Sequence, residues 1–139
     1  MLKPLLLLLL LVGACAAVPM ASQGDDAAGK TFAAPQPGTG SVYIYRDDVI
    51  GGLRVVEITE GQRLIGDLAS HTWLRVDLTP GAHAIRCKFE SPAVLPTSVS
   101  EGDIRYIAVS FGIGRCILNE VDAATARPAI LAGKRAAQI

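Results

Sequence analysis

Eight short runs rich in apolar and β-branched residues recur roughly every ten residues between positions 41 and 121. This recurrence constrains the fold more than any other feature of the chain, because short alternating segments separated by turn residues are typical of all-β domains. The runs are Ser41–Arg46, Leu53–Thr59, Gln62–Leu68, Thr72–Leu78, Ala82–Glu90, Val94–Ser100, Ile104–Phe111 and Arg115–Val121. Their spacing predicts an antiparallel β-sandwich of seven to eight strands.

Turn residues and side-chain alternation agree with this prediction. Glu60-Gly61, Thr79-Pro80-Gly81 and Glu101-Gly102-Asp103 are typical of tight turns between strands. In the run Thr72–Leu78, alternation places Trp73 on the face opposite to the apolar one, and in Ala82–Glu90 it points Cys87 inward. The direction of Cys116 is left undecided, since both faces of its run carry apolar residues.

Three aromatic residues are candidates for a binding face. Trp73 projects to the polar side of its run, and Tyr43 and Tyr45 share one side of theirs. Exposed aromatic side chains can stack on sugars or anchor a protein partner. The alternative is that a C-terminal helix or the opposing sheet covers all three.

Two segments flank the predicted strands. Residues 122–136 are rich in alanine and predict one short C-terminal helix, with Pro128 near its start. Residues 15–40 contain few bulky apolar residues and end in Pro35-Gln36-Pro37-Gly38, which predicts a flexible tether. A short helix around positions 23–28 is the alternative within it. The sandwich domain is therefore expected over residues 41–139.

The first fifteen residues resemble a bacterial lipoprotein signal peptide. Lys3 is followed by an apolar core from Leu5 to Val12 and then by Gly13-Ala14-Cys15. The resemblance implies that residues 1–14 are removed and that the thiol of Cys15 takes up a diacylglycerol, with acyl chains such as palmitate. Ala16, in place of an aspartate, implies sorting to the outer membrane, facing the periplasm. An ordinary leader cut after Ala16 or Ala21 is the alternative.

Lipidation of Cys15 would leave Cys87 and Cys116 as an even pair in an oxidising compartment. A disulfide between them is one interpretation, and two separate buried thiols are the other.

The sequence offers no motif for catalysis, metal binding or a cofactor. His71 and His83 lack the spacing of a zinc site, and no serine lies in a nucleophile elbow. The 13 basic and 13 acidic residues balance, and the arginines are scattered singly, so we expect no nucleic-acid partner. We therefore expect a protein that is not an enzyme and needs no cofactor.

Three segments together resemble a family of small bacterial lipoproteins, domain of unknown function 2846. They are Val42-Tyr43-Ile44-Tyr45-Arg46, the stretch from Trp73 to His83, and Glu101-Gly102-Asp103-Ile104-Arg105-Tyr106. The resemblance implies a sandwich fold and an envelope location, and no activity.

These observations lead to an expected function. We expect a lipid-anchored envelope protein, held to the membrane by Cys15, that acts as an interaction or structural module for an envelope protein or glycan. The alternative is a soluble periplasmic binding or inhibitor protein released by ordinary signal cleavage.

Overall fold

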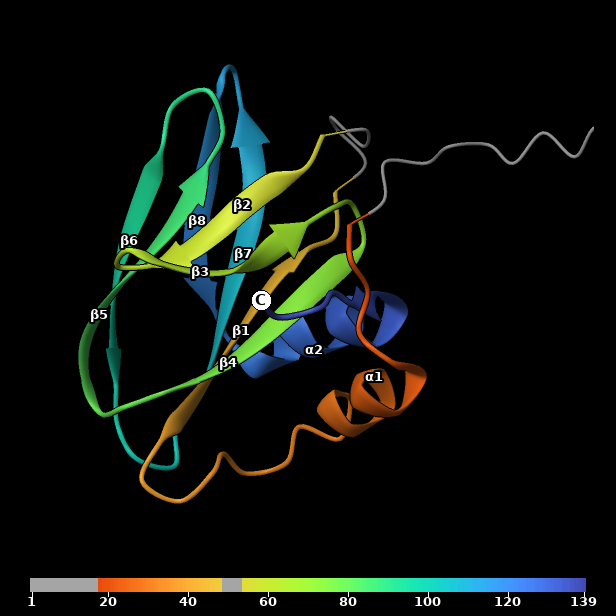
Figure 1. Ribbon diagram of the computed structural model, residues 1–139, viewed down its shortest axis with the longest axis vertical. Helices are drawn as coiled ribbons and strands as arrows, with labels where there is room; N and C mark the ends of the chain where they lie inside the picture. The colour runs from red at the N-terminus through yellow and green to blue at the C-terminus, as the bar shows by residue number, and fades with distance from the viewer. Residues whose placement is uncertain (1–17, 49–53) are drawn as a thin grey trace, which may run out of the picture.

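Two β-sheets pack face to face in the computed structural model, which describes residues 18–48 and 54–139 (Figure 1). The signal peptide expected at residues 1–14, the lipidation site Cys15 and the start of the predicted run Leu53–Thr59 lie outside these residues. The prediction of an all-β sandwich with one short C-terminal helix is confirmed. Within the described ranges the strands are β1 (Gly40–Arg46), β2 (Val56–Glu60), β3 (Arg63–Leu68), β4 (Thr72–Leu78), β5 (Gly81–Lys88), β6 (Ala93–Val99), β7 (Ile104–Gly112), β8 (Arg115–Val121) and β9 (Lys134–Arg135), with helices α1 (Gln23–Gly29) and α2 (Ala123–Ala132).

The strands pair mainly antiparallel, as expected, and the exceptions are two parallel pairs in the five-stranded sheet. The five-stranded sheet has the order β8-β7-β1-β4-β9 and the four-stranded sheet the order β3-β2-β5-β6. Strand β1 runs parallel to β7, and β4 runs parallel to β9. The first parallel pair arises because the turn before β7 lies beside the start of β1, where Ser41 N–H donates to the carbonyl of Asp103 at 2.8 Å.

The main core lies between the two sheets and follows the predicted alternation. Leu74, Val76 and Leu78 of β4 enter it, and Ile85 and Cys87 of β5 are fully buried within it. Burial of such side chains is the main contribution to the stability of the domain.

The flexible tether expected over residues 15–40 is corrected by the structure for residues 18–40. Val18 is only 6% exposed and belongs to the main core. Met20 pairs with Ala136, and the N–H of Ala21 donates to the carbonyl of Arg135 at 3.0 Å. Helix α1 then begins after Ser22, whose hydroxyl accepts from Asp25 N–H at 3.1 Å. The segment is therefore part of the folded domain, attached through both backbone and side-chain contacts.

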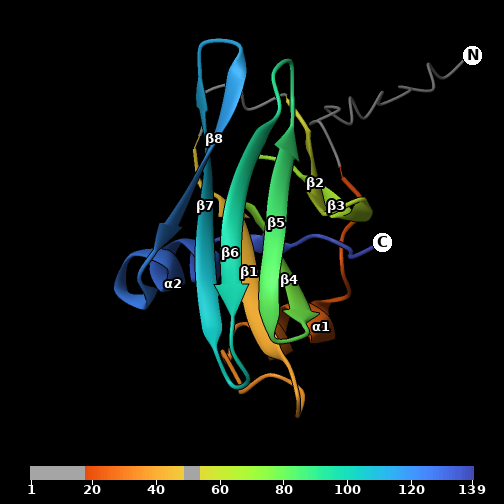
Figure 2. The ribbon, with the colours of Figure 1, turned by 90° about the vertical axis from the view of Figure 1, so that its left-hand side faces the viewer.

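Both helices cover the outer face of the five-stranded sheet, on the side away from the four-stranded sheet (Figures 1 and 2). Helix α2 begins where the carboxylate of Asp122 accepts from Thr125 N–H at 2.8 Å. Pro128 is its sixth residue, further from the start than expected. Among the described helices, neither is long and apolar enough to cross a membrane.

Candidate functional site

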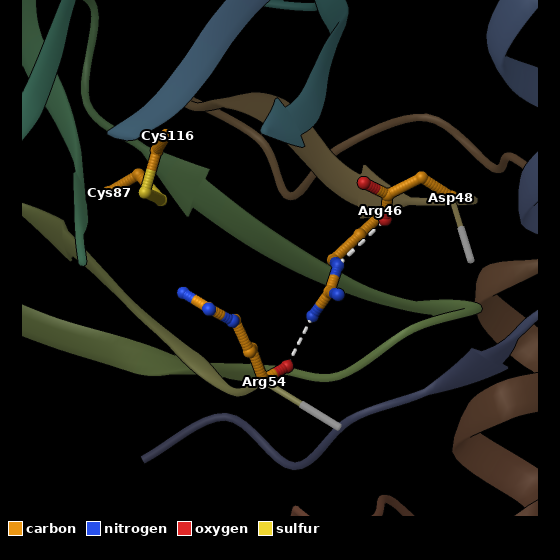
Figure 3. The surroundings of a disulfide bond; sticks show 5 residues. All are labelled: Arg46, Asp48, Arg54, Cys87 and Cys116. Atoms are coloured by element: carbon orange, nitrogen blue, oxygen red, sulfur yellow. Dashed lines mark hydrogen bonds and ion pairs between the residues drawn. A yellow bond between two sulfur atoms is a disulfide. The ribbon is translucent and has the colours of Figure 1, made fainter. Parts of the chain in front are cut away.

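A disulfide joins the two sheets through the main core. Cys87 on β5 and Cys116 on β8 are bonded, with their Cα atoms 6.1 Å apart (Figure 3). Both residues are buried, at 0% and 2% exposure. Of the two interpretations that the sequence left open, the structure therefore contains the bridge, and Cys116 points inward.

The buried Arg46 lies at the end of β1, and sequence analysis treated it only as the last residue of a strand. Its Nε is 2.8 Å from Oδ1 of Asp48, and its Nη1 donates to the carbonyl of Arg54 (Figure 3). Its guanidinium also lies over the ring of Phe111, 4.6 Å from the centroid. A buried charge is tolerated only when it is paired in this way. Arg46 therefore connects the end of β1 to Asp48, to Arg54 and to β7.

The candidate binding face of Tyr43, Tyr45 and Trp73 is covered, so of the two interpretations that the sequence left open, the structure contains the one in which the C-terminal helix packs over these side chains. Their exposures are 0%, 4% and 0%, because α1, α2 and Phe32 pack over them. We define the aromatic cluster as Phe32, Tyr43, Trp73 and Tyr106. Tyr43 lies at its centre, 5.4 to 5.7 Å from the other three rings by centroid distance.

Arginine side chains surround the aromatic cluster and connect it to α1 and α2. Nη1 of Arg75 donates to the hydroxyl of Tyr43 at 3.0 Å, and that hydroxyl donates to the carbonyl of Gly29 at 2.8 Å. Nε of Arg127 donates to the hydroxyl of Tyr106 at 2.9 Å. Burial raises the pKa of Tyr43, although the nearby Arg75 opposes this shift. Tyr43 therefore stays neutral and serves as a hydrogen-bonding group.

Helix α1 packs directly on Trp73. A Cβ atom added to Gly29 would lie 2.3 Å from Cη2 of Trp73, so only glycine permits this approach. Within the described part of the chain, the buried Nε1 of Trp73 has no hydrogen-bond partner. With α1 in this position the cluster is closed to a ligand, and the packing is that of a second core.

An open groove of about 520 Å³ lies between α1, the end of α2 and β9. Two exposed apolar side chains line it, Met20 at 45% and Leu131 at 53% exposure. The carboxylate of Asp26 lies within it, 2.8 Å from Nζ of Lys30. Burial raises the pKa of Asp26, but its bonds to Lys30 and to the backbone N–H of Arg135 outweigh this and lower the pKa below 3.8.

The two histidines occupy separate places. The carbonyl of His71 accepts from Lys134 N–H at 3.0 Å, in the turn before β4. Nδ1 of His83 lies 2.7 Å from Oε1 of Glu60, and its Nε2 lies 2.7 Å from the carbonyl of Thr79. In residues 18–48 and 54–139 no three His, Cys, Asp or Glu side chains gather as a metal site would require.

The sequence did not predict the groove, nor that Phe32 and α1 join α2 in covering the aromatic cluster. Only Phe32 carried a signal, as a single bulky residue in a segment otherwise poor in them. Arg127 and Arg135 gave none, because their partners come from distant parts of the chain.

Comparison with known proteins finds a similar protein in a bacterium. The chain is 35% identical over 81 residues to an uncharacterized protein of Haemophilus influenzae. The match covers 58% of this chain and 48% of the relative, so the chain spans about half the length of the protein it matches. No family model and no solved structure matches the chain.

Proposed function

We propose that the chain is a lipid-anchored lipoprotein of the cell envelope, whose β-sandwich acts as an interaction or structural module without catalysis. The observation that carries this proposal is the leader ending in Val12-Gly13-Ala14-Cys15, directly before the folded domain. Cys15 would carry the lipid and hold the domain to the membrane. By its resemblance to sorting signals, Ala16 supports the outer membrane, on its periplasmic side.

The start of the fold supports a cut before Cys15 over a cut after Ala21. Cleavage after Ala21 would remove Val18 from the main core and Met20 from its pairing with Ala136. The signal peptidase would then discard residues that the domain uses. A cut before Cys15 or after Ala16 leaves these contacts intact.

The disulfide supports export. Cys87 and Cys116 are bonded inside the main core, and such bonds persist in the periplasm and outside the cell. A domain that depends on this bond gains stability only after it has left the reducing cytoplasm.

The burial of the three aromatic binding candidates bears on how the module could contact a partner. Tyr43, Tyr45 and Trp73 pack inside the domain, so contacts with a partner would fall to other parts of its surface. The alternative function is a soluble periplasmic binding or inhibitor protein cut after Ala16. It shares the same fold and differs in lacking the anchor.

Membrane fractionation of Cys15→Ser tests the proposal. In a double-membrane bacterium we expect the unaltered full chain to float with membranes in a density gradient and Cys15→Ser to stay in the soluble fraction. Ala17→Ser is the matched control, since it alters the same segment and leaves the thiol in place. Ala16→Asp tests the location, and we expect it to move the protein to the inner membrane. Unchanged flotation of Cys15→Ser would overturn the proposal.

A further inference from the structure

We propose that the groove between α1 and the end of α2 rests on the lipid bilayer itself, at a surface of anionic headgroups. This inference rests on the proposed function, because it requires the lipid at Cys15. It adds the orientation in which the domain is held and the surface that meets the membrane.

The length of the chain between the anchor and the fold carries the argument. Val18 is buried in the main core, three residues after Cys15. Three extended residues reach at most about 11 Å. The Cα atom of Val18 therefore lies within about 11 Å of that of Cys15. Residues 18–40, as the structure describes them, provide no long tether that could lift the domain clear of the headgroups.

The chain then passes from Val18 directly along the groove. Met20 lines the groove two residues later, and α1 continues beside it to Lys30. Leu131 of α2 lies on the opposite side. Met20 and Leu131 are about half exposed, so together they offer apolar surface at the place to which the anchor brings the bilayer.

The charge of the groove suits anionic headgroups. Lys30, Lys134 and Arg135 line it, against one lining carboxylate, Asp26. Lys30 is paired with Asp26, whereas Lys134 has no ion-pair partner within the described ranges. Long cationic side chains beside exposed apolar residues are typical of surfaces that lie in the headgroup region.

A competing orientation would stand the domain on its hairpin tips. Ile113 lies in the turn between β7 and β8 and is fully exposed. Ile113 is distant from Val18 in the sequence, whereas the groove includes Met20, which lies two residues after Val18. The position of the anchor therefore favours the groove.

Quenching by brominated lipids tests the orientation. The lipidated full chain is reconstituted in vesicles of phosphatidylethanolamine and phosphatidylglycerol with brominated acyl chains. Leu131→Trp and Met20→Trp report on the groove, Ile113→Trp is the matched control on the hairpin, and the buried Trp73 of the unaltered chain gives the background. We expect both groove tryptophans to lose most of their added fluorescence and the hairpin tryptophan to keep it.

Two results would overturn the inference while leaving the proposed function standing. In the first, the protein floats with the vesicles but only Ile113→Trp is quenched, which places the hairpins on the membrane. In the second, it floats and none of the three is quenched, which holds the domain clear of lipid. If the unaltered chain does not float, the anchor is absent and both proposals fail.

Discussion

The two faces of the five-stranded sheet are both buried, but they are built from different chemistry. The face toward the four-stranded sheet carries aliphatic side chains and the disulfide, supplied mostly by the strands themselves. The face under the helices carries the aromatic cluster, which arginines and hydrogen bonds connect to α1 and α2. Strand β4 shows the contrast within one segment, since Leu74 enters the first core and Trp73 the second. An aromatic residue on the polar side of a strand can therefore mark a second core.

The disulfide should give the largest effect, and removing it tests whether the main core governs global stability. The double variant Cys87→Ala/Cys116→Ala opens a link between residues 29 positions apart. In the chain-entropy model this costs about 3 to 4 kcal/mol of unfolding free energy. Urea unfolding of the oxidised parent and of the variant would measure the difference. A loss well below 1 kcal/mol would show that the bond adds little to the core.

A substitution at Gly29 tests the second core, and we expect it to destabilise the domain less than loss of the disulfide. Gly29→Ala would place a methyl group 2.3 Å from Cη2 of Trp73, so we expect α1 to be displaced. Overpacking of this kind typically costs about 1 to 3 kcal/mol. Hydrogen exchange should show faster amide exchange over residues 18–39, with the strands little changed.

Gly24→Ala is the matched control for that change. Gly24 lies in the same helix, and an added Cβ would meet only the hydroxyl of Ser22, at 3.9 Å. We expect it to stabilise the domain by up to about 1 kcal/mol through helix propensity. Equal behaviour of the two variants in hydrogen exchange would contradict tight packing of α1 on Trp73.

Both regions also show what could be predicted from the sequence. The strands were predictable because alternation and turn residues act locally, and the bounds of Thr72–Leu78 and Arg115–Val121 match β4 and β8. The parallel pairing of β1 with β7 could not be predicted, since it depends on the end of the sheet to which the chain returns. The packing of residues 18–40 could not be predicted either. It depends on contacts of Gly29 and of the backbone around Met20 and Ala21, which leave no hydrophobic pattern in the sequence.

The smallest predicted effect is a pH dependence of the free energy of unfolding. It should arise in the four-stranded sheet and not in the second core. The bond to Glu60, followed by that to the carbonyl of Thr79, raises the pKa of His83 above 6.5. The charged histidine therefore stabilises the four-stranded sheet fully below pH 6.5, and this stabilisation is lost as pH rises through the folded-state pKa. Burial raises the pKa of Tyr43 and Tyr45 above 10, so the second core should not contribute near neutrality.

Measuring the free energy of unfolding across this pH window would test whether His83 causes the pH dependence. Because the pair is close to the surface, we expect a decline of less than about 1 kcal/mol. His83→Gln should remove the decline, while Gly29→Ala should keep it. A slope that persists in His83→Gln would place the titrating group elsewhere.

The most direct test of the lipid anchor is the mass of the amino-terminal peptide of the exported protein. Our account predicts a mature chain that begins at Cys15 and carries a diacylglycerol on its thiol, with the folded domain starting three residues later. An unmodified peptide that begins at Ala17 would contradict it and favour the released periplasmic protein.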